Sequence, residues 1–211
     1  MSRFVILMGG DLTVTKRLKS QVQKTRVIAA DGGMAHAETL DLTPELWVGD
    51  FDSTSEELAE RHKGVARHAF PPEKDKTDGE IAVDEAVRLG AREIVMVGGL
   101  GGQADHALAH FGLLLKLGRR RVSAFITSGH EEAYPILNGT HHFDLPRGAR
   151  FSVVPFTDLA GLDLDGVRWP LTNRSVPLGS SLTVSNIATG PVTVRLSQGY
   201  AVALAYPESM G

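Results

Sequence analysis

The chain has 211 residues, of which 42% are hydrophobic and 22% are charged, and its formal net charge is −3. These proportions are typical of globular proteins and exclude disorder, and the length suffices for one large domain or two modest ones. The sequence contains no cysteine, which excludes disulfides and thiolate metal sites. Carboxylates, imidazoles and backbone groups are therefore what remains to bind a metal ion or a phosphate.

The charge pattern and the N-terminal region indicate neither a nucleic-acid nor a membrane partner. The basic run at residues 119–121 is short, and we interpret it as a solvated entry to a strand. The apolar run at residues 4–8 ends at Gly9-Gly10, too early for a signal peptide or a membrane span. We therefore expect a cytoplasmic protein.

Up to about residue 128, short apolar runs alternate with longer helical patterns. Runs that are apolar on both faces are typical of parallel strands covered by helices on each side. The predicted strands are residues 4–8, 27–30, 46–48, 94–97 and 122–127. We therefore expect residues 1–128 to form an α/β domain with a mostly parallel sheet flanked by helices.

Three helices in this region are recognisable. Capping-box spacing at Ser53 and Glu56 predicts a helix over residues 57–63, and the same spacing at Thr77 and Glu80 predicts one over residues 81–89. The apolar stripe of the second helix consists of Ile81, Ala82, Ala86 and Leu89, with Gly90 as its stop. A third helix follows Asp105, with a stripe of Leu108, Phe111, Gly112 and Leu115 and an end at Gly118. We expect both stripes to pack on the sheet.

From residue 129 onward the hydrophobic pattern changes to a period of two. The predicted strands are residues 181–185, 192–196 and 200–206, separated by turns at Thr189-Gly190 and Gln198-Gly199. Short alternating runs between glycine-containing turns are typical of antiparallel strands. We therefore expect residues 129–211 to form a small all-β sandwich.

Two aspartates follow the strand predicted at residues 46–48. Asp50 and Asp52 are two apart in extended chain, so their carboxylates point the same way beyond the carboxyl end of a strand. Mg²⁺, which proteins hold with one or two carboxylates plus substrate phosphates, would relieve their mutual repulsion. The alternative is that both are turn residues ahead of a helix cap.

A second polar cluster precedes the helix predicted at residues 81–89. Helix N-termini attract phosphate, and lysines add cationic partners. Thr77 as a cap and Asp78 as a first-turn acid would also be explained by helix formation alone, but Asp75 would not. The cluster comprises Lys74, Asp75, Lys76, Thr77 and Asp78. We interpret its two aspartates, together with Asp50 and Asp52, as a metal site divided between two loops.

A third cluster is rich in glycine and follows the strand predicted at residues 94–97. It comprises Gly98, Gly99, Gly101, Gly102 and, at the next helix start, Asp105, which suits close approach of backbone N–H groups to a polyphosphate. The segment also fits a loose dinucleotide-binding pattern, but the acidic residue expected about twenty positions on is missing. His106 and His110 lack the glutamate of a zinc-protease helix, so we leave them out of the metal site.

The order of these motifs resembles the thiamine pyrophosphokinase family. The matching segments are residues 30–33, 49–53, 74–78 and 98–106, followed by residues 166–171 and 184–186 in the C-terminal part. The likeness covers nearly the whole chain. It implies transfer of a pyrophosphoryl group from ATP to the hydroxyethyl oxygen of thiamine, with Mg²⁺ as cofactor and release of AMP.

The resemblance also implies roles for individual residues and a homodimer whose sites lie between subunits. Mg²⁺ and phosphates would be held by Asp50, Asp52, Asp75 and Asp78. The nucleotide would contact Asp31, Gly32, Gly33, Lys74, Lys76, Thr77, Asp105 and the loop at residues 98–102. Thiamine would face Trp169, Ser185 and Asn186, although composition alone favours Trp169 as ordinary core.

Two residues depart from the family pattern, and two other functions remain open. Gln103 stands where the family usually has Arg, and His110 stands where it often has Asn. A pterin pyrophosphokinase would use the same acids on a different acceptor. A thiamine- or nucleotide-binding module without turnover is the other alternative, though binding alone has little need for clustered carboxylates near a phosphate.

Overall fold

The computed structural model describes residues 2–51, 54–71 and 75–208. The chain divides into two compact units, the first formed by Met1–His110 with Arg121–Gly129 and the second by Phe111–Arg120 with His130–Gly211. Helix α5 (Ala104–Arg119) has residues in both units.

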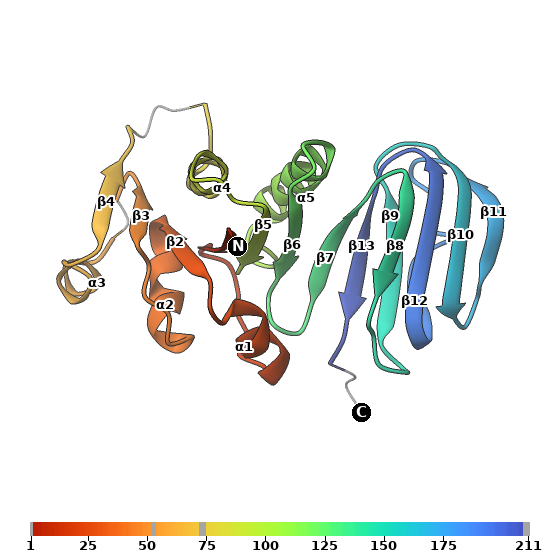
Figure 1. Cartoon of the computed structure of the whole chain (residues 1–211), viewed down its shortest axis with the longest axis horizontal. Coiled ribbons are helices and arrows are strands. Elements are labelled where there is room, and N and C mark those ends of the chain that lie inside the picture. Colours follow the sequence, from red (N-terminus) through yellow and green to blue (C-terminus); the bar gives the residue numbers. More distant parts are fainter. Residues whose placement is uncertain (1, 52–53, 72–74, 209–211) are drawn as a thin grey trace. The chain divides into compact units, whose positions relative to one another are not determined.

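The first unit is built on a parallel sheet (Figure 1). Its strands are β1 (Arg3–Leu7), β2 (Arg26–Ala30), β3 (Leu46–Gly49), β4 (Ala66–Ala69), β5 (Glu93–Val97) and β6 (Ser123–Thr127). They are ordered β4-β3-β2-β1-β5-β6, and every neighbouring pair is parallel. The five predicted strands are confirmed. Strand β4 was missed because all four of its residues are exposed, so it gives no apolar run.

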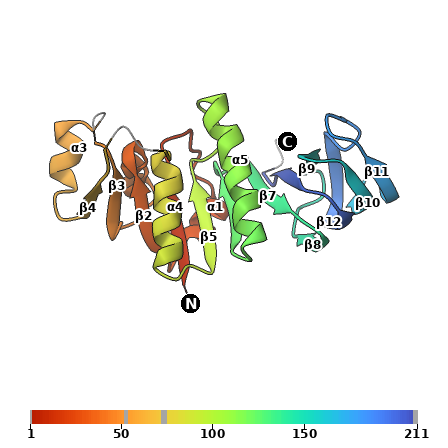
Figure 2. The ribbon, with the colours of Figure 1, turned by 90° about the horizontal axis from the view of Figure 1, so that it is seen from above.

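Helices cover both faces of this sheet (Figures 1 and 2). Helix α1 (Lys16–Val22), the 3₁₀ helix η1 (Asp31–Met34) and α2 (Ala35–Thr39) cover one face, where Leu18 and Met34 share a buried cluster with Trp47. Helix α4 (Asp78–Arg88) packs over β1, β2 and β3 from the other face. The α/β prediction for this part of the chain is therefore confirmed.

The two predicted helix starts have different outcomes. Helix α3 (Glu56–Arg61) is capped by Ser55, whose hydroxyl accepts a hydrogen bond from Leu58 N at 3.2 Å. The prediction that Ser53 caps this helix was wrong, because Ser55, two positions later, makes the capping bond. Ser53 itself lies outside the described residues. Helix α4 is capped by Thr77 as predicted, and the Thr77 hydroxyl accepts a hydrogen bond from Glu80 N at 3.3 Å. It buries the predicted Ile81, Ala82 and Ala86, whereas Leu89 is its C-cap.

The predicted apolar stripe of α5 was wrong. Leu108 is 60% exposed, and the buried positions are His110, Leu113, Leu114 and Leu117. Both sets have the spacing i, i+3, i+4, i+7, so two stripes on the same helix satisfy one periodicity. Because the stripe that contains His110 is the buried one, the imidazole of His110 lies in the interior.

The second unit is β-rich, and its strands pair in antiparallel fashion. Its strands are β7 (Glu132–Ile136), β8 (Gly139–Phe143), β9 (Arg150–Pro155), β10 (Leu159–Val167), β11 (Leu171–Val176), β12 (Asn186–Gln198) and β13 (Ala201–Tyr206). Strand β13 pairs with β7 and β9, and β12 pairs with β8, β9 and β10, which also pairs with β11. Its apolar core includes Phe143, Phe151 and Leu164.

Two details predicted for this unit were wrong. Residues 181–185 form turns rather than a strand, with Val184 N bonded to Ser181 O, because their alternation arises from exposed apolar side chains. The expected turn at Thr189-Gly190 is absorbed into β12, where a register shift against β10 takes up the glycine. The predicted break at Gln198-Gly199 is confirmed, because β12 ends at Gln198 and β13 begins at Ala201, with Gly199 at φ +114°.

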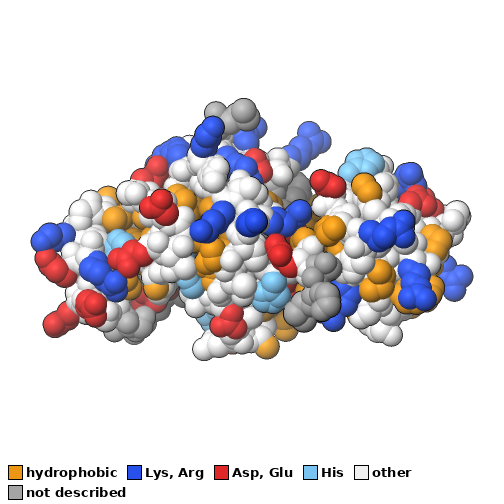
Figure 3. Space-filling model, turned by 90° about the horizontal axis from the view of Figure 1, so that it is seen from below, with side chains coloured by type: hydrophobic (Ala, Val, Ile, Leu, Met, Phe, Trp, Pro, Cys, Tyr) orange, Lys and Arg blue, Asp and Glu red, His pale blue; other side chains and the backbone are white. Residues whose placement is uncertain are grey.

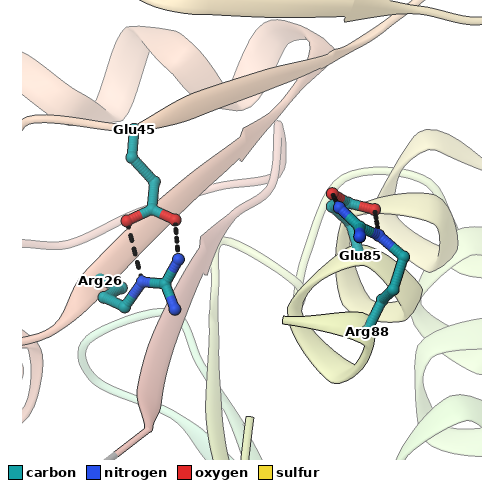
Figure 4. Close-up of polar contacts among 4 residues, drawn as sticks. All are labelled: Arg26, Glu45, Glu85 and Arg88. Atoms are coloured by element: carbon teal, nitrogen blue, oxygen red, sulfur yellow. Dashed lines mark hydrogen bonds and ion pairs between the residues drawn. The ribbon is translucent and has the colours of Figure 1, made fainter. Parts of the chain in front are cut away.

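The described surface carries acidic and basic groups side by side. On the face in Figure 3 the two signs are interspersed over the first unit. Figure 4 shows two bidentate pairs, Arg26 with Glu45 at 2.6 and 3.0 Å and Arg88 with Glu85 at 2.5 and 2.8 Å. Such exposed pairs contribute little to stability. Among the residues described, no helix is both long and apolar enough to cross a membrane.

Candidate active site

The strand order of the first unit reverses at β1. Strands β2, β3 and β4 lie on one side of β1, and β5 and β6 lie on the other, so the connections leaving this point diverge. Open α/β sheets bind ligands in the crevice outside the carboxyl ends of their strands at such a point. A cavity of about 510 Å³ lies there.

Segments following three strands line this cavity together with the start of α4 and the start of α5. Half of the lining residues are glycines, so much of its wall is backbone. The lining residues are Met8, Gly9, Gly10, Ala30, Asp31, Gly32, Thr77, Asp78, Gly79, Gly98, Gly99, Gly101, Gly102, Gln103, His106 and His110.

The glycines after β1 and β5 allow two backbones to touch. Gly10 N donates to Gly98 O at 2.9 Å, and a Cβ on Gly10 would lie 2.5 Å from that oxygen. Gly98 itself has φ +75°, which side chains rarely adopt. His36 Nε2 is 2.9 Å from Gly10 O and must donate to it, because a carbonyl only accepts. Any larger residue at either glycine would separate β1 from β5 at the cavity.

Asp31 forms a corner directly after β2. Its φ of +40° is unusual for a residue other than glycine, and its carbonyl accepts a 2.9 Å hydrogen bond from the buried indole of Trp47. Gly49, the last residue of β3, packs against it, since a Cβ on Gly49 would lie 3.2 Å from Asp31 Cβ. The half-buried Asp50 therefore leaves β3 beside the Asp31 corner.

The start of α4 contributes Thr77, Asp78 and Gly79 to the cavity. Its free N–H groups and dipole favour an anion there. Lys76 is not a lining residue, because its ammonium group is 2.7 Å from Asp84 in an exposed ion pair. Asp75 is exposed and does not line the cavity, and Lys74 lies outside the described residues.

The predicted four-carboxylate metal site stays a prediction. Asp52 lies outside the described residues. Over residues 2–51, 54–71 and 75–208, no three His, Asp or Glu side chains come together closely enough to hold a metal ion. Asp78 lines the cavity, while Asp50 does not.

The structure thus brings most of the predicted nucleotide contacts together. The lining includes Asp31, Gly32, Thr77, Gly98, Gly99, Gly101 and Gly102, but not Gly33 or Asp105. Gly33 instead packs on β1, where a Cβ would lie 2.2 Å from Leu7 O.

Sequence reasoning missed several lining residues. Gly9 and Gly10 directly follow the first predicted strand, which is the same signal that identified Gly98, and it could have found them. His106 and His110 were weighed as metal ligands and left out of the predicted site. Burial lowers the pKa of His110, and the neighbouring His106 adds to this effect.

The second unit places the three residues predicted to face thiamine close together in the chain's fold. Trp169 is 55% exposed, which excludes the alternative that it belongs to the core, and Arg168 lies 5.1 Å above its ring. The amide of Asn186 accepts from Trp169 N at 3.2 Å and donates to Trp169 O at 2.8 Å, which fixes the Trp169 backbone. Ser185 is exposed and has φ +62°.

The fold and cavity of the first unit define a class of α/β proteins whose site lies where the strand order reverses. The wall of this site consists largely of glycine backbone and a helix N-terminus, as is typical of phosphate sites, and the first unit is followed by a β-rich one. Family models refine this. Residues 18–126 match the catalytic domain of thiamin pyrophosphokinase, and residues 140–201 match its vitamin B1 binding domain. The chain belongs to the thiamin pyrophosphokinase family.

One relative and two solved structures match this chain over nearly their whole length. A thiamine pyrophosphokinase of Bacillus subtilis is 29% identical over 191 residues, covering 88% of this chain and 89% of the relative. The solved structure of thiamine pyrophosphokinase from Bacillus subtilis has a TM-score of 0.87 at 25% identity, covering 98% of this chain and 99% of that one. The enzyme from Geobacillus thermodenitrificans has a TM-score of 0.83 at 28% identity, with 99% of both chains covered.

Proposed function

We propose that this chain transfers a pyrophosphoryl group from ATP to thiamine, giving thiamine diphosphate and AMP. In that reaction the thiamine hydroxyethyl oxygen bonds to the β-phosphorus, the bond from that phosphorus to the AMP oxygen breaks, and the hydroxyl proton passes to a base. The cavity at the switch point carries the proposal. It lies among residues that match the catalytic model, and its glycine-rich wall suits a polyphosphate.

The phosphates would bind the backbone of the glycine loop and the start of α4. N–H groups of the Gly98–Gly102 segment and of the first turn of α4 can donate to phosphate oxygens, and Thr77 fixes that turn. Because the formal net charge of the chain is −3, attraction of an anion depends on such local groups. Phosphoryl-type transfer needs mainly this kind of positioning and charge neutralisation.

Mg²⁺ fits the donor set of the cavity. A chain without cysteine offers oxygen ligands, and Mg²⁺ is typically bound by one or two carboxylates with substrate phosphates supplying further oxygens. Asp78 at the cavity and Asp50 beside the Asp31 corner would hold it, together with the predicted Asp52 and Asp75. The ion would neutralise phosphate charge when bound.

Thiamine would bind the second unit at Trp169. The exposed face of this indole suits the cationic thiazolium or the pyrimidine ring, and the Asn186 amide holds its backbone in place. Ser185 adds an exposed hydroxyl in the same segment. This assignment agrees with the match of residues 140–201 to the vitamin B1 binding model.

The chain would act as a homodimer, with each site formed by the first unit of one subunit and the second unit of the other. Exposed large apolar side chains support an interface on the second unit. Six large hydrophobic side chains are exposed among the described residues. Four of them fall between residues 169 and 184: Trp169, Leu178, Leu182 and Val184. The cytoplasmic location and the boundary between residues 128 and 129 remain predictions.

Chromatography of AMP and ADP tests the reaction. With ATP and Mg²⁺, we expect AMP to form only when thiamine is added, and no ADP to form. If AMP instead forms only when a hydroxymethyl pterin is added, the acceptor is the pterin and not thiamine. Replacing Asp78 by Asn should abolish turnover, because a cavity carboxylate is lost. Asp84→Asn is the matched control, since Asp84 pairs with Lys76 outside the cavity and should retain activity. Full activity of Asp78→Asn would refute the metal assignment.

A further inference from the structure

The imidazole of His110 lies at the cavity with one nitrogen already engaged. The residue is 9% exposed, sits on α5 and lines the cavity. Its Nδ1 is 2.9 Å from the carbonyl oxygen of Gly99. A carbonyl can only accept, so Nδ1 carries the hydrogen, and this bond fixes both the ring orientation and the tautomer.

The other ring nitrogen points toward the start of α4. Nε2 lies 3.5 Å from the position that a Cβ on Gly79 would occupy, and Gly79 is itself a lining residue. Within residues 2–51, 54–71 and 75–208, no protein group hydrogen-bonds to Nε2. Because Nδ1 carries the hydrogen, Nε2 of the neutral ring is an acceptor, and burial, which lowers the pKa of His110, favours this neutral form.

The chemistry of an acceptor at this point selects the part of a nucleotide that can meet it. Phosphate oxygens at neutral pH are acceptors as well, so they would bind the N–H groups of the glycine loop and of α4 rather than Nε2 of the neutral ring. The nucleoside, in contrast, has N–H and O–H donors. The thioether of Met8 lies beside the same two glycines, 3.0 Å from an ideal Cβ of Gly79 and 3.1 Å from that of Gly99, which gives this part of the cavity an apolar floor.

We propose that His110 determines nucleotide specificity by accepting, through Nε2, a hydrogen bond from an N–H or O–H group of the nucleoside in this cavity. The donor is either the exocyclic amine of adenine or a ribose hydroxyl. The proposal rests on the proposed function only in taking the cavity as the nucleotide site.

Two substitutions distinguish the role of Nδ1 from that of Nε2. The amide nitrogen of Asn in His110→Asn falls near Nδ1 and can keep the bond to Gly99, but no atom replaces Nε2. The longer side chain in His110→Gln brings an amide near Nε2 and gives up the Gly99 bond. Thermal unfolding of both variants, compared with the native chain, establishes that they are folded.

Calorimetric binding of nucleotides, without thiamine, keeps this test independent of turnover. ATP is compared with inosine triphosphate, which lacks the amine, and with 2′-deoxy-ATP and 3′-deoxy-ATP. The native chain should bind one of the three analogues about 5- to 150-fold more weakly than ATP, the range for a binding site that leaves one hydrogen-bonding group unpaired. The analogue that loses affinity identifies the donor.

His110→Asn should bind ATP as weakly as the native chain binds that analogue, and it should no longer distinguish the two. His110→Gln should keep part of the discrimination. Equal affinity of the native chain for all four nucleotides would overturn the proposal. So would an equal loss for ATP and every analogue in His110→Asn, because His110 would then only position the glycine loop. Failure of thiamine-dependent AMP release with intact nucleotide discrimination would instead count against the proposed function alone.

Discussion

The adjacent glycines Gly32 and Gly33 give a matched test of the packing beneath the cavity. A Cβ on Gly33 would lie 2.2 Å from Leu7 O, 2.5 Å from Leu7 C and 2.8 Å from Met8 N. All three are backbone atoms of β1 and the residue after it, so no flexible side chain can move aside. A Cβ on Gly32 would meet nothing within 4 Å, and neither glycine has a positive φ. The two Gly→Ala changes therefore differ only in space.

Overpacking of this kind costs about 1–3 kcal/mol, whereas an open surface position changes stability by less than about 0.5 kcal/mol. A chain of this length loses roughly 2–4 °C of Tm for each kcal/mol. Gly33→Ala should therefore lower the Tm by about 2–12 °C, and Gly32→Ala by less than about 2 °C. Thermal unfolding followed by circular dichroism, without ligand, measures both. Equal Tm values would refute the packing role assigned to Gly33.

Three further outcomes are expected. Trp47→Phe should lower the free energy of unfolding by about 1–3 kcal/mol in urea titrations, because it leaves the Asp31 carbonyl without its indole donor, while Trp169→Phe, at an exposed position, should change it by less than about 0.5 kcal/mol. The lowered pKa of His110 means that the unfolded chain binds this proton at higher pH than the folded chain. Stability is therefore fully present above the ordinary value of 6.5 and declines as the pH falls below it, and a urea series should show that His110→Asn lacks part of this decline. Gln103→Arg should retain or raise AMP formation, because a cation at the cavity compensates phosphate charge; a large loss would show that Gln103 has another role.

The sequence was most informative where one pattern had one structural solution. Apolar runs on both faces identified the buried strands β1, β2, β3, β5 and β6, because such runs are covered on both sides of a parallel sheet. The glycine loop after β5 and the cap at Thr77 were also predictable, since each depends on local geometry. These signals identified the glycine loop and the start of α4 as parts of the cavity, whereas Asp31 and Gly32 were named only through the family resemblance.

The remaining errors have physical causes. The stripe on α5 had two solutions of equal periodicity, and tertiary packing chose the one containing His110. Exposed apolar residues such as Leu182 imitated a strand, although they form part of a turn. The role of Gly33 depends on contact with β1, twenty-odd residues away, which no local pattern contains.

The composition of the cavity wall also limits how this site can change over generations. A ligand held by peptide groups of Gly9, Gly32 or Gly99 is recognised by atoms that every residue possesses, so mutation can obstruct these contacts but cannot give them a new chemical character. Heritable variation in ligand preference must act through the few lining positions that have functional side chains. These are Asp31, Thr77 and Asp78 together with Gln103, His106 and His110, so half of the positions through which ligand preference can change lie on α5 or directly before it.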